Sequence, residues 1–306
     1  MTGLPPAGTA VRIVEVGPRD GLQNERAAVS TGDKIAFVAR LADAGLRAIE
    51  VGAFVSPRRV PQMADADAVV RGLPRRPGVT FSALVPNLEG LERALAAGVP
   101  EVAIFAAASE TFSRHNINRG IDESLAIYGE VARAALAAGV RVRGYLSTCF
   151  GCPYEGEVPE ARVVGLADRL LAMGAYEVVL SDTIGIAHPG QVRSLLEQTR
   201  HAVPVGATAL HFHDTRGTGL ANVLMALSLG ITTFDASAGG LGGCPFAPGA
   251  AGNLATEDLV YLLDGLGLAT GVNLQALVSA SAFLEPRLDH PLPSKVYQAE
   301  RRKRTA

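Results

Sequence analysis

Two histidines lie one residue apart at the end of a short apolar run. The run Ala209–His213 predicts a strand, so the side chains of His211 and His213 should point to the same side and reach one metal ion. A hydrogen-bonded pair of core histidines is the alternative interpretation. Because Asp214 follows directly, the pair favours a metal site, and Asp20 is the expected third ligand.

Nitrogen and oxygen ligands without a thiolate are typical of an open site for Mg²⁺ or Mn²⁺, which leaves room for waters and a chelating substrate. Zinc remains an alternative because imidazole also suits that metal.

The three cysteines require separate interpretations. Cys244 follows the run Gly239–Gly243, whose glycines permit unusual backbone angles and close approach to a ligand, so we expect a reactive thiol. Cys149 and Cys152 form a C-x-x-C pair, but neither a thioredoxin-like context nor a second cysteine pair accompanies them. We therefore interpret these two as small loop residues. So few cysteines form no disulfide framework, which is typical of a reducing compartment.

Strands and helices alternate about eight times along the chain, which predicts a (β/α)₈ barrel with parallel strands. An open dinucleotide-binding sheet is disfavoured, because Pro18 and Arg19 occupy the turn where its glycine fingerprint would lie. The predicted strands are Val11–Val16, Ala48–Phe54, Val79–Val85, Glu101–Ala107, Val140–Ser147, Tyr176–Ser181, Ala209–His213 and Thr233–Ala236.

The first cycle continues with a long loop, Gly17–Val29, and a helix, Thr31–Ala44, which Gly45 closes. Gly98, Gly139, Gly174 and Gly230 are expected to end later helices in the same left-handed way. After the last strand come helices at Thr256–Leu266 and Asn273–Leu284, and an extension rich in proline and charge, residues 286–306. We expect one catalytic domain over residues 1–306.

Active sites of such barrels lie where the strands end, and polar residues are dense at these positions. All of them should face one mouth. They are Arg19 with Asp20, Glu50, Tyr145 with Ser147, Asp182 with Thr183, His211 with His213, and the loop Gly239–Cys244.

Composition excludes several classes of function. A hydrophobic fraction of 48% and a net charge of −2 describe a globular protein without the basic field that nucleic acid requires. The basic run Arg301–Arg304 is interpreted as a solvated tail. The N-terminal residues resemble no targeting signal, and no segment has the apolar length of a membrane span. The sequence thus predicts a cytoplasmic protein.

Taken together, the motifs resemble those of hydroxymethylglutaryl-CoA lyases, from Val14 to about Gln298. The matching segments are Val14–Glu25, Phe54–Pro57, Gly151–Gly156, Asp182–Gly185, His211–Thr215, Gly240–Phe246 and Gly252–Asp258. The resemblance implies Mg²⁺ or Mn²⁺ held by Asp20, His211, His213 and Asn253. It also implies retro-Claisen cleavage of hydroxymethylglutaryl-CoA to acetoacetate and acetyl-CoA, a reaction of leucine and ketone-body catabolism.

In this mechanism Arg19 stabilises the developing enolate. Cys244 protonates the enolate carbon or completes the closed site, and Asp182 or Glu50 is the base or positions it. The expected substrate-binding residues are Gln23, Ser56, Tyr145 and Ser147. An acyl-CoA is the expected partner, with a homodimer as the expected assembly.

Some positions depart from the animal enzymes of this group and leave the acyl group open. Arg216-Gly217-Thr218 stands where those enzymes carry Tyr-Gly-Gln, and Ala238-Gly239 where they carry Val-Ala. Arg216 is therefore a candidate contact for a different acyl group or a CoA phosphate. The alternatives are a lyase for another branched hydroxyacyl-CoA such as citramalyl-CoA, a related Claisen-condensing synthase, and a non-catalytic binding barrel.

Overall fold

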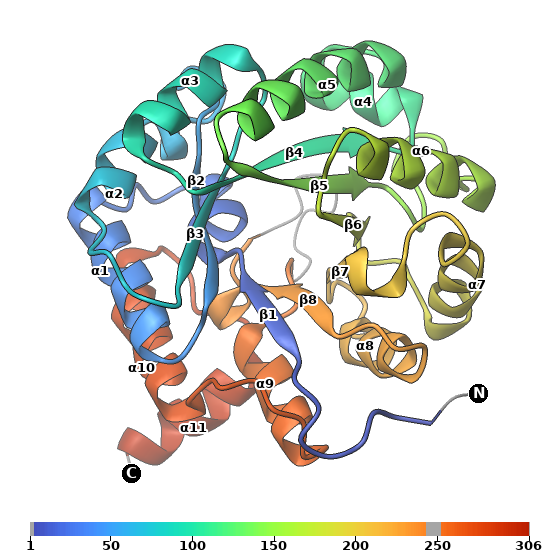
Figure 1. The fold of residues 1–306 in the computed structure, drawn as a ribbon. Helices are drawn as coiled ribbons and strands as arrows, with labels where there is room; N and C mark the ends of the chain where they lie inside the picture. Colours follow the sequence, from blue (N-terminus) through green and yellow to red (C-terminus); the bar gives the residue numbers. More distant parts are fainter. Residues whose placement is uncertain (1–2, 243–251, 306) are drawn as a thin grey trace.

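The strands form a closed parallel barrel in the computed structural model, which describes residues 3–242 and 252–305 (Figure 1). Each strand pairs with the next along the chain, and β8 pairs back with β1. The predicted barrel is confirmed, and each strand end lies within about one residue of its predicted position. The strands are β1 Arg12–Glu15, β2 Ala48–Ala53, β3 Thr80–Leu84, β4 Glu101–Ala107, β5 Arg141–Ser147, β6 Glu177–Asp182, β7 Thr208–Phe212 and β8 Thr233–Ala236.

The helices surround the barrel and cover the outward side chains of the strands (Figure 1). Helix α4 is an additional element between β4 and α5. The helices are α1 Thr31–Asp43, α2 Ala66–Gly72, α3 Leu88–Ala97, α4 Glu110–Ile117, α5 Ile121–Ala137, α6 Glu160–Ala172, α7 Pro189–Thr199, α8 Gly219–Ser228, α9 Thr256–Gly265, α10 Leu274–Leu284 and α11 Lys295–Thr305. Short helical turns are η2 Pro61–Met63, η3 Val205–Ala207, η4 Ala238–Gly240 and η5 Glu285–Arg287.

Alternation within β5 directs polar groups into the barrel. Arg143, Tyr145 and Ser147 occupy every second position, and Arg143 reaches Asp235 on β8 while Tyr145 reaches Glu50 on β2. The intervening residues face the helices, as the period of two in a strand requires. The face of β5 that points into the barrel is therefore polar, and its last residues lie at the mouth.

The segment after β1 is not the simple loop that the sequence predicted. Its first part, η1 Gly17–Gly21, is a π-helix in which the Val16 carbonyl accepts hydrogen bonds from three successive amides, those of Arg19, Asp20 and Gly21. Single π-turns of this kind occur often at functional sites. This one carries two neighbouring charged side chains at the end of β1.

The C-terminal extension contains α11 and most of η5, and it packs beside α9 and α10 (Figure 1). Asp258 begins α11 by accepting hydrogen bonds from Ser294 Oγ and from the amides of Lys295 and Val296. Within the described ranges, no helix is both long enough and apolar enough to cross a membrane.

Two glycine substitutions test whether the left-handed backbone and close packing at Gly45 require glycine. Gly45 follows α1 with φ +105°, and a Cβ there would lie 2.2 Å from the carbonyl oxygen of Gly271. Gly45→Ala should therefore lower the free energy of unfolding by about 2 kcal/mol or more. The control is Gly129→Ala inside α5, where a Cβ meets nothing within 4 Å, and it should raise stability by about 0.5–1 kcal/mol. Denaturant unfolding measures both, and equal effects would contradict the argument.

Candidate metal centre and active site

Asp20, His211 and His213 converge at the mouth of the barrel. One potential ligand atom from each lies within 4.8 Å of the others, and His211 Nε2 is 3.9 Å from Asp20 Oδ2. Nδ1 of His213 is buried without a hydrogen-bond partner among the described residues. Burial, followed by the neighbouring His211, lowers the pKa of His213 to about 3. A neutral imidazole with a free lone pair is the form that binds a metal.

Asn253 contributes a fourth group to the same cluster. Its backbone forms an isolated bridge with His213, and its amide nitrogen donates to Asp20 Oδ2 at 2.8 Å and to the Leu241 carbonyl at 3.0 Å. The amide oxygen is left buried without a partner in the described part of the chain. A buried oxygen that has no hydrogen-bond partner destabilises the fold unless a cation or a donor contacts it. These donors therefore suit a divalent cation.

The orientation of His211 is set by a buried carboxylate behind it. His211 Nδ1 lies 3.3 Å from Asp235 Oδ2, and Arg143 Nη2 donates to the other oxygen of Asp235 at 2.8 Å. Burial alone would raise the pKa of Asp235, but Arg143 and then His211 lower it to about 2. An ionised carboxylate holding Nδ1–H leaves Nε2 free to face Asp20, which is how metal-binding histidines are commonly oriented.

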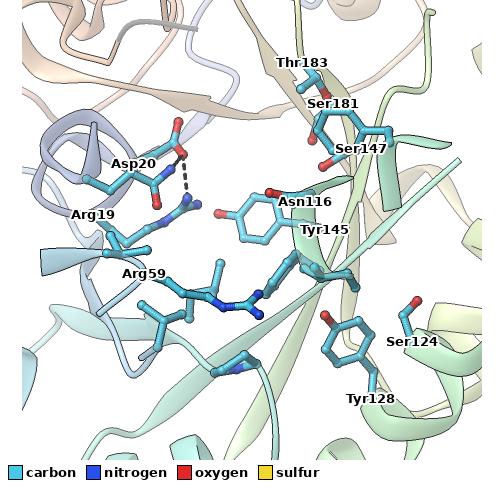
Figure 2. A pocket seen from close by; sticks show the side chains of 18 of the residues that line it. Arg19, Asp20, Arg59, Asn116, Ser124, Tyr128, Tyr145, Ser147, Ser181 and Thr183 are labelled. Carbon is cyan, nitrogen blue, oxygen red and sulfur yellow. Dashed lines mark hydrogen bonds and ion pairs between the residues drawn. The ribbon is translucent and has the colours of Figure 1, made fainter. Parts of the chain in front are cut away.

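Arg19 occupies a fixed position beside this cluster. Its guanidinium donates to Asp20 Oδ1 at 2.5 Å and to Glu50 Oε2 at 2.8 Å, and Tyr145 donates to the same Glu50 oxygen at 3.1 Å. Figure 2 shows Arg19 and Asp20 together at one side of the pocket. A β-bulge between Glu50 and Gly52 shifts the register of β2 at this point. The Arg19 guanidinium is thus held in place with little freedom to move.

A cavity of about 630 Å³ opens in front of these groups. The residues predicted to bind substrate all line it, and Gln23 also donates to Asp20 Oδ1 at 2.7 Å. Ser181 and Thr183 line it as well, and their positions on either side of Asp182 at a strand end were a usable signal. No local sequence pattern indicated the other polar lining residues, which include Arg59, Asn116, Arg119 and Tyr128.

The two carboxylates predicted as base or positioning group do not line the cavity. Asp182 accepts hydrogen bonds from the amides of Ile186 and Ala187, each at 3.0 Å, and so holds the loop after β6. Burial raises its pKa to about 6. Glu50 keeps one oxygen for Arg19 and Tyr145, while its Oε1 is buried without a partner among the described residues.

Two buried glutamates anchor the start of the glycine-rich loop, and no local sequence pattern indicated either of them. Glu15 accepts from the amide of Ala238 at 2.9 Å, and Glu257 accepts from the amide of Gly239 through both oxygens. Farther along, Gly242 has φ +100°, and a Cβ there would lie 2.5 Å from the amide nitrogen of Asn253. Cys244 itself lies outside the described residues.

Cys149 and Cys152 are free and buried, and both carry local hydrogen bonds rather than a disulfide. The thiol of Cys149 donates to the Leu146 carbonyl at 3.0 Å, and burial raises its pKa. Cys152 lies 2.9 Å from Ser109 Oγ. The raised pKa of Cys149 disfavours the thiolate form, which is the form that reacts.

Arg216 is not among the residues that line the described cavity. It donates to the carbonyls of Ile184 and Gly185 at 3.0 and 2.9 Å and so ties the loop after β7 to the loop after β6. The contact with substrate that the sequence suggested finds no support in this geometry.

Comparisons with known proteins show which family the chain resembles. The HMGL-like family model matches residues 10–284. The mitochondrial hydroxymethylglutaryl-CoA lyase of Rattus norvegicus is 53% identical over 289 residues, 94% of this chain and 89% of the relative. The crystal structure of the Pseudomonas aeruginosa hydroxymethylglutaryl-CoA lyase superposes with a TM-score of 0.95 at 51% identity, covering 97% of this chain and 99% of that one. A structure of an HMG-CoA lyase from Acinetobacter baumannii, in complex with coenzyme A and 3-methylmalate, gives a TM-score of 0.91 at 39% identity, with 95% of each chain covered.

Fold and site define a barrel enzyme whose mouth is built to hold a divalent cation beside a fixed guanidinium. Within that class, the chain belongs to the HMGL-like family.

Removing the carboxylate behind His211 tests how the cluster is positioned. Asp235→Asn should weaken Mn²⁺ binding by about 10-fold to 100-fold, because His211 loses the partner that orients its ring. The matched control is Glu177→Gln, which disturbs the same Arg143 at 2.7 Å but does not contact His211. Calorimetric titration with Mn²⁺ measures both affinities. Equal losses in the two variants would show that the network acts only through stability.

Proposed function

We propose that this protein cleaves hydroxymethylglutaryl-CoA to acetoacetate and acetyl-CoA. The observation that carries the proposal is the convergence of Asp20, His211 and His213 beside Arg19 at one cavity. The identity of about half of all residues with hydroxymethylglutaryl-CoA lyases, over nearly the full chain, supports it.

Asp20, His211, His213 and Asn253 would hold the ion, with Mg²⁺ or Mn²⁺ preferred because the carboxylate and amide oxygens are hard ligands. A bound divalent ion supplies Lewis-acid chemistry that lowers the pKa of the tertiary hydroxyl of the substrate. Gln23 holds Asp20 in its position through the 2.7 Å hydrogen bond. The cavity has space for the rest of the acyl group.

The bond that breaks joins the tertiary carbon to the carbon next to the thioester. Its electron pair passes toward the thioester oxygen, while a general base takes the proton of the hydroxyl, which becomes the ketone of acetoacetate. The proton that the enolate carbon later gains balances the one that the hydroxyl gives up. Arg19 would donate to the thioester oxygen as the charge develops, and its contacts with Asp20 and Glu50 hold it there before substrate arrives. Such preorganisation is worth about 10²–10³-fold in rate for a single donor.

Glu50 and Asp182 act as positioning residues in this account. Glu50 fixes Arg19 and Tyr145, and Asp182 fixes the loop that carries Thr183. Cys244 is proposed to give a proton to the enolate carbon, which completes acetyl-CoA. Ser56, Tyr145 and Ser147 would contact the substrate from the cavity wall. A homodimer, a single domain and a cytoplasmic location stay predictions of the sequence.

Product analysis separates this activity from its rivals. Incubation with hydroxymethylglutaryl-CoA should yield acetoacetate and acetyl-CoA in equal amounts, with a kcat/KM well above that for citramalyl-CoA. A higher kcat/KM for citramalyl-CoA would move the chain to another acyl group. Absence of products from both thioesters would support a non-catalytic barrel, and net condensation from acetyl-CoA would support a synthase.

A further inference from the structure

The cavity has a second polar side that the cleavage chemistry does not use. Asp20 and Thr183 lie on one side of it in Figure 2, whereas Ser124 and Tyr128 of α5 lie on the other. Arg59 extends from the loop after β2 across the cavity toward this second side (Figure 2).

Arg59 is an exposed arginine whose guanidinium has no hydrogen bond or ion pair within the part of the chain that the structure describes. Its backbone is held by a turn, in which the amides of Arg59 and Val60 both donate to the Ser56 carbonyl at 3.0 Å. The base of the side chain is therefore fixed while its charge is free. A free guanidinium can bind an anion through two parallel hydrogen bonds.

Two other arginines at the strand ends of the barrel are already engaged. Arg119 lines the same cavity but forms an ion pair with Glu123. Arg216 donates to two loop carbonyls. Arg58 is exposed and does not line the described cavity. Arg59 is thus the best available partner for an anionic group of a ligand that reaches out of the cavity.

Part of the cavity lining suits an uncharged linker. Leu84, Phe105 and Ile127 contribute apolar surface to the cavity, and Asn116 offers an amide. An acyl-CoA has the matching order of groups: an anionic acyl head, a neutral pantetheine arm and then phosphates.

We propose that Arg59 binds the phosphates of the CoA moiety and so selects CoA thioesters over shorter ones. The inference rests on the proposed function, because it assumes that the acyl head occupies the metal side. Arg59 acts on binding and takes no part in bond cleavage.

Kinetics with two thioesters test this directly. Arg59→Ala should raise KM for hydroxymethylglutaryl-CoA about 10-fold with little change in kcat, since a charge-assisted contact is lost. The KM for hydroxymethylglutaryl-pantetheine, which lacks the nucleotide and its phosphates, should not change. Arg59→Lys should give a KM for hydroxymethylglutaryl-CoA between those of the wild type and Arg59→Ala. Lysine keeps the positive charge but cannot donate the two parallel hydrogen bonds of a guanidinium. Arg58→Ala is the matched control and should leave both KM values unchanged.

Equal losses with the two thioesters, or no loss with either, would overturn the role of Arg59. Calorimetric titration with CoA alone separates this failure from failure of the proposed function. Arg59→Ala should weaken CoA binding about 10-fold relative to both wild type and Arg58→Ala. A wild-type protein that binds CoA through Arg59 and cleaves no hydroxymethylglutaryl-CoA would refute the lyase and leave the CoA contact standing, whereas unchanged CoA affinity would refute the contact.

Discussion

Buried charge inside the barrel is the constraint on which the site depends. The side chain of Arg143 is only 2% exposed, and it donates to Glu177, Tyr145 and Asp235 from the centre of the barrel. An unpaired charge at such depth would destabilise the fold by several kcal/mol, about 3–5 when one partner is removed. Every charge in this network must therefore be paired. Asp235, held by Arg143, in turn orients His211. Tyr145 donates to Glu50, which in turn accepts from Arg19.

Two segments at the mouth of the barrel complete the site above this network of buried charges. The π-helix after β1 presents Arg19 and Asp20 side by side, and the segment Ser237–Gly242 packs against it with Gly242 close to Asn253. Glu15 and Glu257 hold the amides of Ala238 and Gly239 from below. Asp20 and Asn253, candidate metal ligands from opposite ends of the sequence, thus meet because the closing pair of β1 and β8 brings these segments together.

Much of this arrangement could be predicted from sequence because it is periodic. Strand runs and terminal glycines marked the barrel, and Gly45, Gly98, Gly139, Gly174 and Gly230 all have positive φ. The spacing of His211 and His213 placed both rings on one side of a strand, and the strand-end rule added Asp20. Those inferences need only local geometry and the common edge of a parallel sheet.

Other features depend on contacts that no local pattern reports. Arg143 on β5 and Asp235 on β8 are far apart in the sequence, and only the closed barrel brings them together. In the π-helix, the Val16 carbonyl accepts hydrogen bonds from three successive amides. No residue preference within Gly17–Gly21 predicts this pattern. Asp182 lies at a strand end as predicted, yet its side chain turns to backbone amides rather than into the cavity. The strand end locates a residue near the mouth without fixing the direction of its side chain.

The carbon–carbon cleavage should require a divalent ion at Asp20, His211 and His213. The most direct test is acetoacetate release from hydroxymethylglutaryl-CoA by metal-stripped protein, before and after addition of Mg²⁺ or Mn²⁺. We expect no release from the stripped protein and recovery with either ion. Undiminished release without metal, or none after both ions are supplied, would contradict it.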